Sequence, residues 1–294
     1  MPAPELSDQA VEAGLDALES PRSARAGRST VDRLRWIARA VLPPVVALVL
    51  LVAVWQVVWA SAVLPEFAIP APAKVGGDLW DLISSGAVWS ILWTSIHRAV
   101  LGFLAGLVIG TPLGFLVAKV RVVRSAIGPL LSGLQSLPSV AWVPAAILWF
   151  GITPAAIYFV VLLGSVPSIA NGLVAGIDQV PPILPRVGKT LGAGRLASAW
   201  HILLPAALPG YLAGLKQGWA FSWRSLMAAE LIANSPQLGQ GLGQFLEFAS
   251  SYNDMAKVLT AIVLILLVGV GIDVIVFRPL ERSVLRARGL TGTP

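Results

Sequence analysis

Long apolar stretches without a charged side chain divide the chain into predicted membrane helices. Residues 41–60 and 99–118 contain no Asp, Glu, Lys or Arg, and about 20 residues of helix cross a hydrocarbon layer once. A third charge-free stretch, residues 125–177, is too long for one crossing, so we expect it to reverse at Gly151-Ile152-Thr153-Pro154. With two further apolar segments, the pattern predicts an all-α polytopic membrane protein with six transmembrane helices. Their expected ranges are 41–60, 98–118, 127–150, 154–177, 208–232 and 257–277.

The two ends of the chain differ from this apolar body. Residues 1–39 are rich in Ala, Ser, Pro and Arg, which predicts a largely disordered tail, or one with a short amphipathic helix. This tail is not expected to be a signal peptide, because the first apolar stretch begins late and is too long for one. The membrane domain is predicted at 40–280, and a C-terminal tail at 281–294.

Composition supports a bilayer environment and excludes several kinds of chemistry. Hydrophobic residues make up 56% of the chain and charged residues 12%, against about a quarter charged in soluble domains. No cysteine is present, which rules out disulfides, thiolate metal sites and cysteine nucleophiles. His97 and His201 are far apart, which argues against a histidine-based metal centre. We therefore predict no catalytic residue, no metal site and no cofactor of the chain's own.

The net charge of +6 resembles that of a nucleic-acid-binding protein, but its distribution indicates topology. Sixteen of the 21 basic residues fall in the two tails and in two loops that six crossings place on the same side. Because basic residues accumulate on the cytoplasmic side of a membrane protein, both termini are predicted to be cytoplasmic. No binding of nucleic acid is expected.

Two predicted helices carry glycine at every fourth position. Such rows allow helix backbones to approach closely in lipid. They indicate either a tight interface that can act as a hinge or ordinary membrane packing. The rows are Gly102, Gly106, Gly110 and Gly114, and Gly210, Gly214 and Gly218.

The connection from Asp178 to Gly210 is predicted to be cytoplasmic and folded. A short helix is expected at 183–191, a turn at Gly192-Ala193-Gly194, and a second helix at 195–204 that ends at Pro205. Gly188-Lys189-Thr190 is similar to the end of a phosphate-binding P-loop, but the glycine that the motif needs at position 183 is isoleucine. The chain is therefore not expected to bind ATP by that route.

This connection resembles the EAA loop of the membrane subunits of bacterial ABC importers. Gly192, nine further residues and then Ile202-x-Leu204-Pro205 match the pattern G-x9-I-x-L-P. The similarity continues through LPAALPGYLAGLKQGWAFSWRSLMAAELIA, ILWFGITPAAI and SIHRAVLGFLAGLVIGTPLG. Over roughly residues 60–280 these segments are similar to the sulfonate/nitrate/taurine branch of binding-protein-dependent permeases. The resemblance implies the type I ABC importer permease fold and a location in the bacterial inner membrane.

In that family the loop forms a coupling helix that binds in a cleft of the ATPase subunit. The pattern departs where the family has Glu-Ala-Ala, because Arg186, Val187 and Gly188 stand there. An arginine in place of the acid reverses one electrostatic contact, and Gly188 weakens the helix by about 1 kcal/mol relative to alanine. The resemblance implies contact with the ATPase by Arg186, Lys189, Thr190, Leu191, Gly192, Ala193, Gly194 and Arg195.

The partners follow from the same resemblance. One chain holds one such loop, whereas a pair of ATPase subunits offers two clefts, so we expect a homodimer on two cytoplasmic ABC ATPase subunits. ATP and Mg²⁺ would be bound by those subunits. An extracytoplasmic substrate-binding protein is expected to contact the connections at 61–96 and 233–256. Each partner would favour one conformation of a path that opens alternately to either side.

Charged residues inside the fifth predicted span are candidates for the path. Ionisable groups in a membrane helix are costly unless they face protein or water. Lys216 and Arg224 lie about 80° apart on a helical wheel, and with Glu230 they suggest a path for a small anion. Aliphatic sulfonates are the first candidate solute, with nitrate and taurine as alternatives. A structural role is the other interpretation, with Arg224 paired to Glu230 or Asp273 and Lys216 extended to the cytoplasmic interface.

Two other classes of function receive less support from the sequence. An intramembrane enzyme would need catalytic spacing among residues such as Asp273, Glu230 and His97, and none is recognised. A secondary transporter would show repeated halves, and none is visible. His97 and Arg98, near the outer end of a helix, are expected to be interfacial anchors or supports of a gate.

Overall fold

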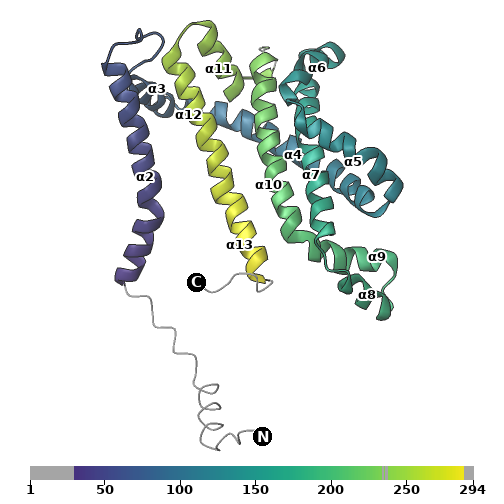
Figure 1. Cartoon of the computed structure of the whole chain (residues 1–294). Helices are drawn as coiled ribbons and strands as arrows, with labels where there is room; N and C mark the ends of the chain where they lie inside the picture. Colours follow the sequence, from purple (N-terminus) through teal and green to yellow (C-terminus); the bar gives the residue numbers. More distant parts are fainter. Residues whose placement is uncertain (1–29, 234, 236–237, 288–294) are drawn as a thin grey trace, which may run out of the picture. The chain divides into compact units, whose positions relative to one another are not determined.

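The computed structural model describes residues 30–233, 235 and 238–287, and the elements in this part of the chain are helices (Figure 1). The chain divides into two units, residues 1–63 and 64–294. The first unit contains α2 (Thr30–Ala60). No glycine or proline lies between residues 30 and 41, and α2 begins within the predicted tail, at Thr30. The short helix predicted earlier in the tail lies outside the described residues.

The second unit contains the remaining elements. Its first half comprises α3 (Pro72–Ser84), α4 (Ala87–Lys119), α5 (Arg121–Ser136), the 3₁₀ turn η1 (Ser139–Trp142), α6 (Val143–Phe150) and α7 (Pro154–Asp178). Its second half comprises α8 (Ile183–Thr190), α9 (Arg195–Ser198), the π-helical η2 (Ala199–Leu203), α10 (Leu204–Ile232), α11 (Leu242–Ser251), α12 (Met255–Ile272), the π-helical η4 (Asp273–Phe277) and α13 (Arg278–Ala287). Within this unit α8 and α9 lie at one end of the bundle, and α3, α6 and α11 lie at the other (Figure 1).

Length and apolarity alone do not reproduce six crossings. Among the described residues, four helical stretches are long and apolar enough to cross a membrane, or five if a bent pair counts as one. α10 is long enough but less apolar, because it contains Lys216, Arg224 and Glu230. The four stretches are Leu42–Ala60, Ala87–Lys119, Pro154–Asp178 and Met255–Ala287.

The predicted continuous span at 127–150 is wrong. α5 and the η1–α6 segment meet at an angle of 99°. Leu137, between them, has an extended backbone with φ −76° and ψ 134°, because the ring of Pro138 disfavours a helical conformation in the residue before it. In contrast, Pro167 lies inside α7 without ending it. The predicted reversal does occur, since α6 ends at Phe150 and α7 begins at Pro154.

α7 is packed between α4 and α10 through glycine. The row Gly102, Gly106, Gly110 and Gly114 is buried and faces α7. On the other side, α7 contributes its own glycines, since Gly172 lies against Gly214 and Gly176 against Gly210. At these points an added Cβ atom would strike backbone atoms of the neighbouring helix. The three helices therefore touch backbone to backbone, which is how helices gain dispersion energy in lipid.

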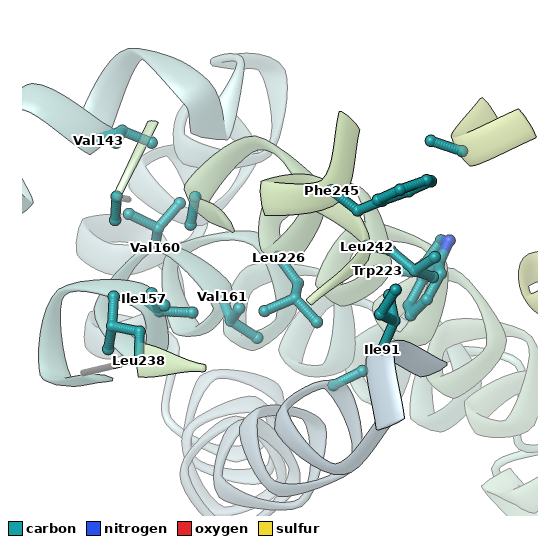
Figure 2. Packing of buried hydrophobic residues seen from close by; sticks show 14 of the residues in the cluster. Ile91, Val143, Ile157, Val160, Val161, Trp223, Leu226, Leu238, Leu242 and Phe245 are labelled. Atoms are coloured by element: carbon teal, nitrogen blue, oxygen red, sulfur yellow. The ribbon is translucent and has the colours of Figure 1, made fainter. Parts of the chain in front are cut away.

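The largest cluster of buried apolar side chains lies toward the end of the bundle where α6 and α11 are found (Figure 2). It joins α4, α6, α7, α10 and the loop into α11, so helices far apart in sequence share one core. A smaller cluster, formed by Leu173, Ile177, Leu203 and Ala207, joins α7 to the start of α10 at the other end. The large cluster includes Ile91, Val143, Ile157, Val160, Val161, Trp223, Leu226, Leu238, Leu242 and Phe245.

The glycine contact gives a first prediction. Replacing Gly214 by alanine places a methyl group against the backbone of Gly172, and overpacking of this kind costs about 1–3 kcal/mol. We expect a lower midpoint of thermal unfolding in detergent. Gly77→Ala is the matched control, because nothing lies within 4 Å of its added Cβ atom. The control should gain up to about 1 kcal/mol from helix propensity, and equal effects of the two changes would contradict the packing argument.

Candidate functional site

The loop between α7 and α10 is closed by a Schellman motif at the end of α8. The amide of Ala193 donates to the carbonyl of Gly188 at 2.9 Å, and the amide of Gly192 donates to the carbonyl of Lys189 at 3.1 Å. Gly192 has φ +82°, the left-handed conformation that this motif requires after a helix and that glycine adopts without strain. The predicted turn therefore lies where the sequence placed it, and α8 ends at Thr190.

Gly188 is needed because α8 packs closely on the chain that follows. An added Cβ atom at Gly188 would collide with the side chain of Ile202, the isoleucine of the G-x9-I-x-L-P pattern. Gly188 stands where the family has alanine, and glycine inside a helix makes α8 less stable than alanine would. Glycine also allows α8 to pack directly on η2. The lower helix stability is therefore explained by a close tertiary contact.

The expectation that Pro205 ends a helix is wrong. η2 is a π-helical segment from Ala199 to Leu203, and it leads directly into α10, which begins at Leu204. Pro205 lies in the first turn of α10, where its missing N–H is tolerated. The loop is therefore joined to α10 by continuous helical structure.

The exposed side of α8 is apolar. Ile183, Leu184, Val187 and Leu191 are exposed and recur at helical spacing, and Leu191 at the tip is 82% exposed. Exposed apolar side chains grouped on one face mark a contact surface for another molecule. The basic residues Arg186 and Lys189 are exposed on the same helix.

Arg224 lies on the uncovered side of α10. Its Nε donates to the carbonyl of Ala220 at 3.1 Å, and its guanidinium lies 4.5 Å from the ring centroid of Phe221. Among the described residues, no carboxylate forms an ion pair with it. The predicted pairing of Arg224 with Glu230 or Asp273 is therefore not formed.

Lys216 is bound instead by Asp273. Its Nζ lies 2.7 Å from Oδ1 of Asp273, and the Nε of Arg278 lies 3.5 Å from Oδ2 of the same carboxylate. The pair joins α10 to the π-helical η4 after α12. Lys216 thus has a structural partner, which the sequence did not assign to it.

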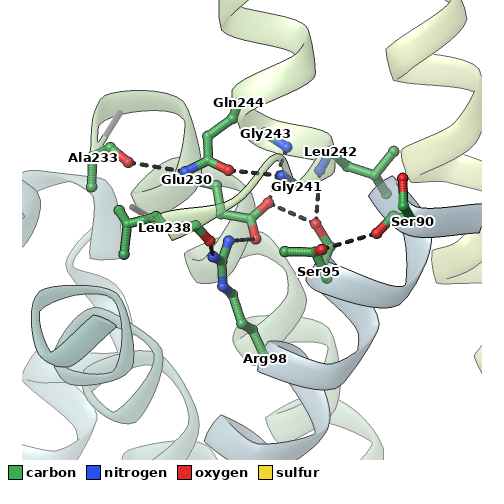
Figure 3. Close-up of polar contacts among 11 residues, drawn as sticks. Ser90, Ser95, Arg98, Glu230, Ala233, Leu238, Gly241, Leu242, Gly243 and Gln244 are labelled. Carbon is green, nitrogen blue, oxygen red and sulfur yellow. Dashed lines mark hydrogen bonds and ion pairs between the residues drawn. The ribbon is translucent and has the colours of Figure 1, made fainter. Parts of the chain in front are cut away.

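Glu230 is fully buried, with 0% of its surface exposed, near the end of α10. Its carboxylate accepts hydrogen bonds from Ser95 Oγ at 2.7 Å, from Arg98 Nη1 at 2.8 Å and from the amide of Gly243 at 3.1 Å (Figure 3). An added Cβ atom at Gly241 would lie 2.5 Å from both carboxylate oxygens. Only glycine therefore allows the loop before α11 to lie over the carboxylate.

Arg98 is the partner of Glu230, which the sequence did not assign to it. It is 8% exposed and also donates through Nη2 to the carbonyl of Leu238, so it is not an interfacial anchor. The sequence does contain a signal for this buried site: Ser95 and Arg98 are three residues apart and so lie on one side of an otherwise apolar helix. Together these contacts tie α4, α10 and the loop into α11 to one buried charge pair.

The same loop is held by a second set of hydrogen bonds. Gln244 Oε1 accepts from the amide of Gly241 at 2.7 Å, and its Nε2 donates to the carbonyl of Ala233 at 3.3 Å (Figure 3). Gln244 is itself buried. Buried polar groups that are all satisfied make a region rigid, so these bonds hold Ala233 and Gly241 firmly to the start of α11.

Acidic and basic side chains gather at the end of the bundle where α3 meets the start of α12. A cleft there is lined by residues that include Glu66, Lys74, Tyr252 and Asp254. Burial and the neighbouring Asp254 carboxylate raise the pKa of Asp78 above its usual value of 3.8. The hydrogen bond from Lys257 lowers the pKa of Asp254. Among the described residues, no group of three or more His, Asp or Glu side chains is arranged to hold a metal ion.

In the part of the chain that the structure describes, a bundle that contains long apolar helices defines a helical membrane protein. The family model "Binding-protein-dependent transport system inner membrane component" matches residues 110–283. The chain therefore belongs to this family.

Curated relatives from three organisms are similar to the chain. The aliphatic sulfonates transport permease SsuC (a putative assignment in its own name) of Bacillus subtilis is 31% identical over 273 residues, covering 90% of this chain and 94% of the relative. The taurine transport system permease TauC of Escherichia coli is 30% identical over 225 residues, covering 73% and 82%. The nitrate import permease NrtB of Leptolyngbya laminosa is 28% identical over 272 residues, covering 88% and 94%.

A solved structure supports the fold. A chain of the MetNI methionine ABC transporter in inward-facing conformations superposes with a TM-score of 0.55 and 21% identity, covering 67% of this chain and 95% of that chain. The predicted family, an ABC importer permease of the sulfonate, nitrate and taurine branch, is confirmed. The predicted all-α permease fold is confirmed as well. The protein is a multi-pass component of the inner membrane, of a class that works with ATPase subunits and a substrate-binding protein.

The buried ion pair gives a second prediction. Glu230→Gln leaves the guanidinium of Arg98 buried without its counter-charge, and breaking a buried pair in this way costs about 3–5 kcal/mol. We expect a large fall in the thermal unfolding midpoint of the purified protein. Asp178→Asn is the control, because it breaks the exposed pair of Asp178 and Arg124, for which about 0–1 kcal/mol is typical. A Glu230→Gln effect no larger than that of the control would show that the buried network does not stabilise the fold.

Proposed function

We propose that the chain forms the translocation path for a small anionic solute, most specifically an aliphatic sulfonate. It acts as a homodimer on two cytoplasmic ATPase subunits, which bind ATP and Mg²⁺ and hydrolyse the nucleotide. The observation that carries the proposal is the uncovered Arg224 inside α10. A cation in a membrane helix is tolerated where it faces protein or water, and an anion that passes along such a face is its natural partner.

Arg224 and the glycine row occupy different sides of α10. Gly210, Gly214 and Gly218 pack against α7, whereas Arg224 is exposed. The packed side holds the helix in the bundle, and the other side remains free to line a path. Lys216 and Glu230 are less suited to contact the solute, since each is held by an ion pair within the chain.

Relatives named for sulfonate, taurine and nitrate transport share one chemical feature in their solutes. Each solute carries a compact anionic group of oxygen atoms. A single guanidinium on the path suits all three, so selection among them is assigned to the binding protein. The relative that covers most of this chain among those described above is named for aliphatic sulfonates, which is why we place sulfonates first and keep nitrate and taurine as alternatives.

The loop between α7 and α10 is the proposed contact with the ATPase. Its apolar stripe ends in Leu191, and Thr190, Gly192, Ala193 and Gly194 flank it in the chain; Arg195, which follows them, is part of the proposed contact. The Schellman motif fixes the shape of this tip, and η2 joins it to α10. Closure of the ATPase on the loop would thus act on the helix that carries Arg224. The excess of basic residues near this loop and at both termini supports a cytoplasmic location for all three.

Transport tests the role of Arg224. With ATPase subunits and binding protein in proteoliposomes, Arg224→Gln should lower ATP-driven uptake of an alkanesulfonate at least about tenfold, the equivalent of about 1.4 kcal/mol. Arg282→Gln is the control, because it removes an exposed cation from α13 and should leave uptake unchanged. Normal uptake by Arg224→Gln would remove Arg224 from the path. Uptake of nitrate but not of sulfonates by the unaltered complex would replace the proposed solute.

Assembly tests the role of the loop. Leu191→Asp puts a charge into the proposed apolar contact and should abolish co-purification of the ATPase subunit. Tyr252→Asp is the matched control, since Tyr252 is 81% exposed but lies near the opposite end of the bundle. If the ATPase remains bound to Leu191→Asp at the affinity of the control, this loop is not the coupling contact.

A further inference from the structure

A cleft of about 750 Å³ lies between the end of α4 and the loop of α8 and α9. Two charged residues line it, Lys119, which is the last residue of α4, and Lys189 in the last turn of α8. The described residues that line the cleft include no acid. Within the part of the chain that the structure describes, neither lysine forms an ion pair with a carboxylate. The cleft is therefore positively charged and suited to an anion.

This cleft lies where α4 reaches the surface of the membrane. α4 is a candidate membrane span, and its residues 99–118 carry no charge, so Lys119 marks the edge of the hydrocarbon layer. Phe115, one turn earlier, forms an apolar part of the wall, and Ala199 and Leu203 add to that wall from η2. Apolar walls combined with cations at the edge of a bilayer match a ligand that is both anionic and apolar.

An apolar strip of α4 leads from the cleft toward the middle of the membrane. Leu101, Leu104 and Val108 are exposed, and their spacing puts them on the same side of the helix as Phe115 and Lys119. The glycine row of α4 lies on the opposite side, against α7. Acyl chains can therefore lie along this strip while a headgroup occupies the cleft.

The cleft and the apolar stripe of α8 lie on different sides of that helix. The stripe begins at Ile183 and ends at Leu191, whereas Pro185 and Lys189 line the cleft. On a helical wheel, Pro185 and Lys189 lie opposite the centre of the stripe. An ATPase subunit bound to the stripe thus leaves the cleft open, and Lys189 remains available to another partner.

We propose that this cleft binds the phosphate of an anionic phospholipid, held by Lys119 from α4 and Lys189 from α8, with the hydroxyl of Ser198 as a further donor. Basic residues next to a membrane span attract anionic headgroups. A free inorganic anion would satisfy the two charges but leave the apolar walls in contact with water, so a lipid is the better occupant. A bound headgroup would hold α8 against the end of α4.

This proposal goes beyond the proposed function. It assigns Lys189 to a lipid rather than to the ATPase, and it holds for any transported solute.

Lipid binding by the purified full-length protein tests the proposal. In native mass spectrometry from detergent, phosphatidylglycerol should bind at least about tenfold more tightly than phosphatidylcholine, whose headgroup has no net charge. The double variant Lys119→Gln with Lys189→Gln should lose this preference. Lys119→Arg with Lys189→Arg should keep it, because both positive charges remain. Arg282→Gln with Arg286→Gln is the matched control, since it removes two exposed cations of α13 at the same end of the bundle (Figure 1) and should also keep the preference.

Loss of the preference in the glutamine pair alone supports the site. Equal loss in the arginine pair or in the control, or no loss in the glutamine pair, overturns it. Displacement of phosphatidylglycerol by inorganic phosphate at the same concentration would assign the cleft to a free anion and overturn the lipid. Release of the lipid when ATPase subunits bind would show that the ATPase fills the cleft, which overturns the proposal as well. Failure of the ATPase to bind at all would count against the proposed function and leave the lipid result standing.

Discussion

Contact between the backbones of α7 and its two neighbours is the constraint on which the rest of the structure depends. Apolar side chains gain little by leaving lipid, so membrane helices are held together by close approach and by hydrogen bonds. Gly172 and Gly214 meet at such an approach, and the glycine row of α4 meets the other side of α7. With α7 fixed in this way, α10 has one side that is packed and one side that is uncovered. The uncovered side is where Arg224 lies.

α10 connects the two ends of the bundle. At one end it continues from the loop of α8 and α9 through the π-helical η2, and at the other it carries Glu230. The Glu230–Arg98 pair binds the loop before α11 to α4 and α10. A displacement at the loop of α8 and α9 would therefore act on a helix whose far end is held by buried hydrogen bonds and an ion pair. This continuity is the physical basis of the proposal that ATPase closure is transmitted to the solute path.

The charges within the membrane region divide into those that form ion pairs within the described chain and one, Arg224, that does not. Glu230 and Arg98 satisfy one another, as do Lys216 and Asp273. Arg224, close to them in sequence, has only a backbone carbonyl and an aromatic ring of its own helix as partners among the described residues. Such a cation is tolerated in a membrane helix only where protein or water takes the place of lipid.

The sequence by itself determined the features that depend on near neighbours along the chain. These include the apolar helices, the reversal at Pro154, the glycine turn at Gly192 and the motif that identifies the family. Tertiary structure decided the rest. The partner of Glu230 is Arg98, 132 residues away, and no local pattern names it. Proline shows the same division, because the helical path is broken at Pro138 but continues through Pro205. A proline leaves a backbone carbonyl of the preceding turn without its hydrogen-bond donor. Whether the helix continues depends on whether neighbouring helices satisfy that carbonyl, so packing decides the result rather than the proline itself.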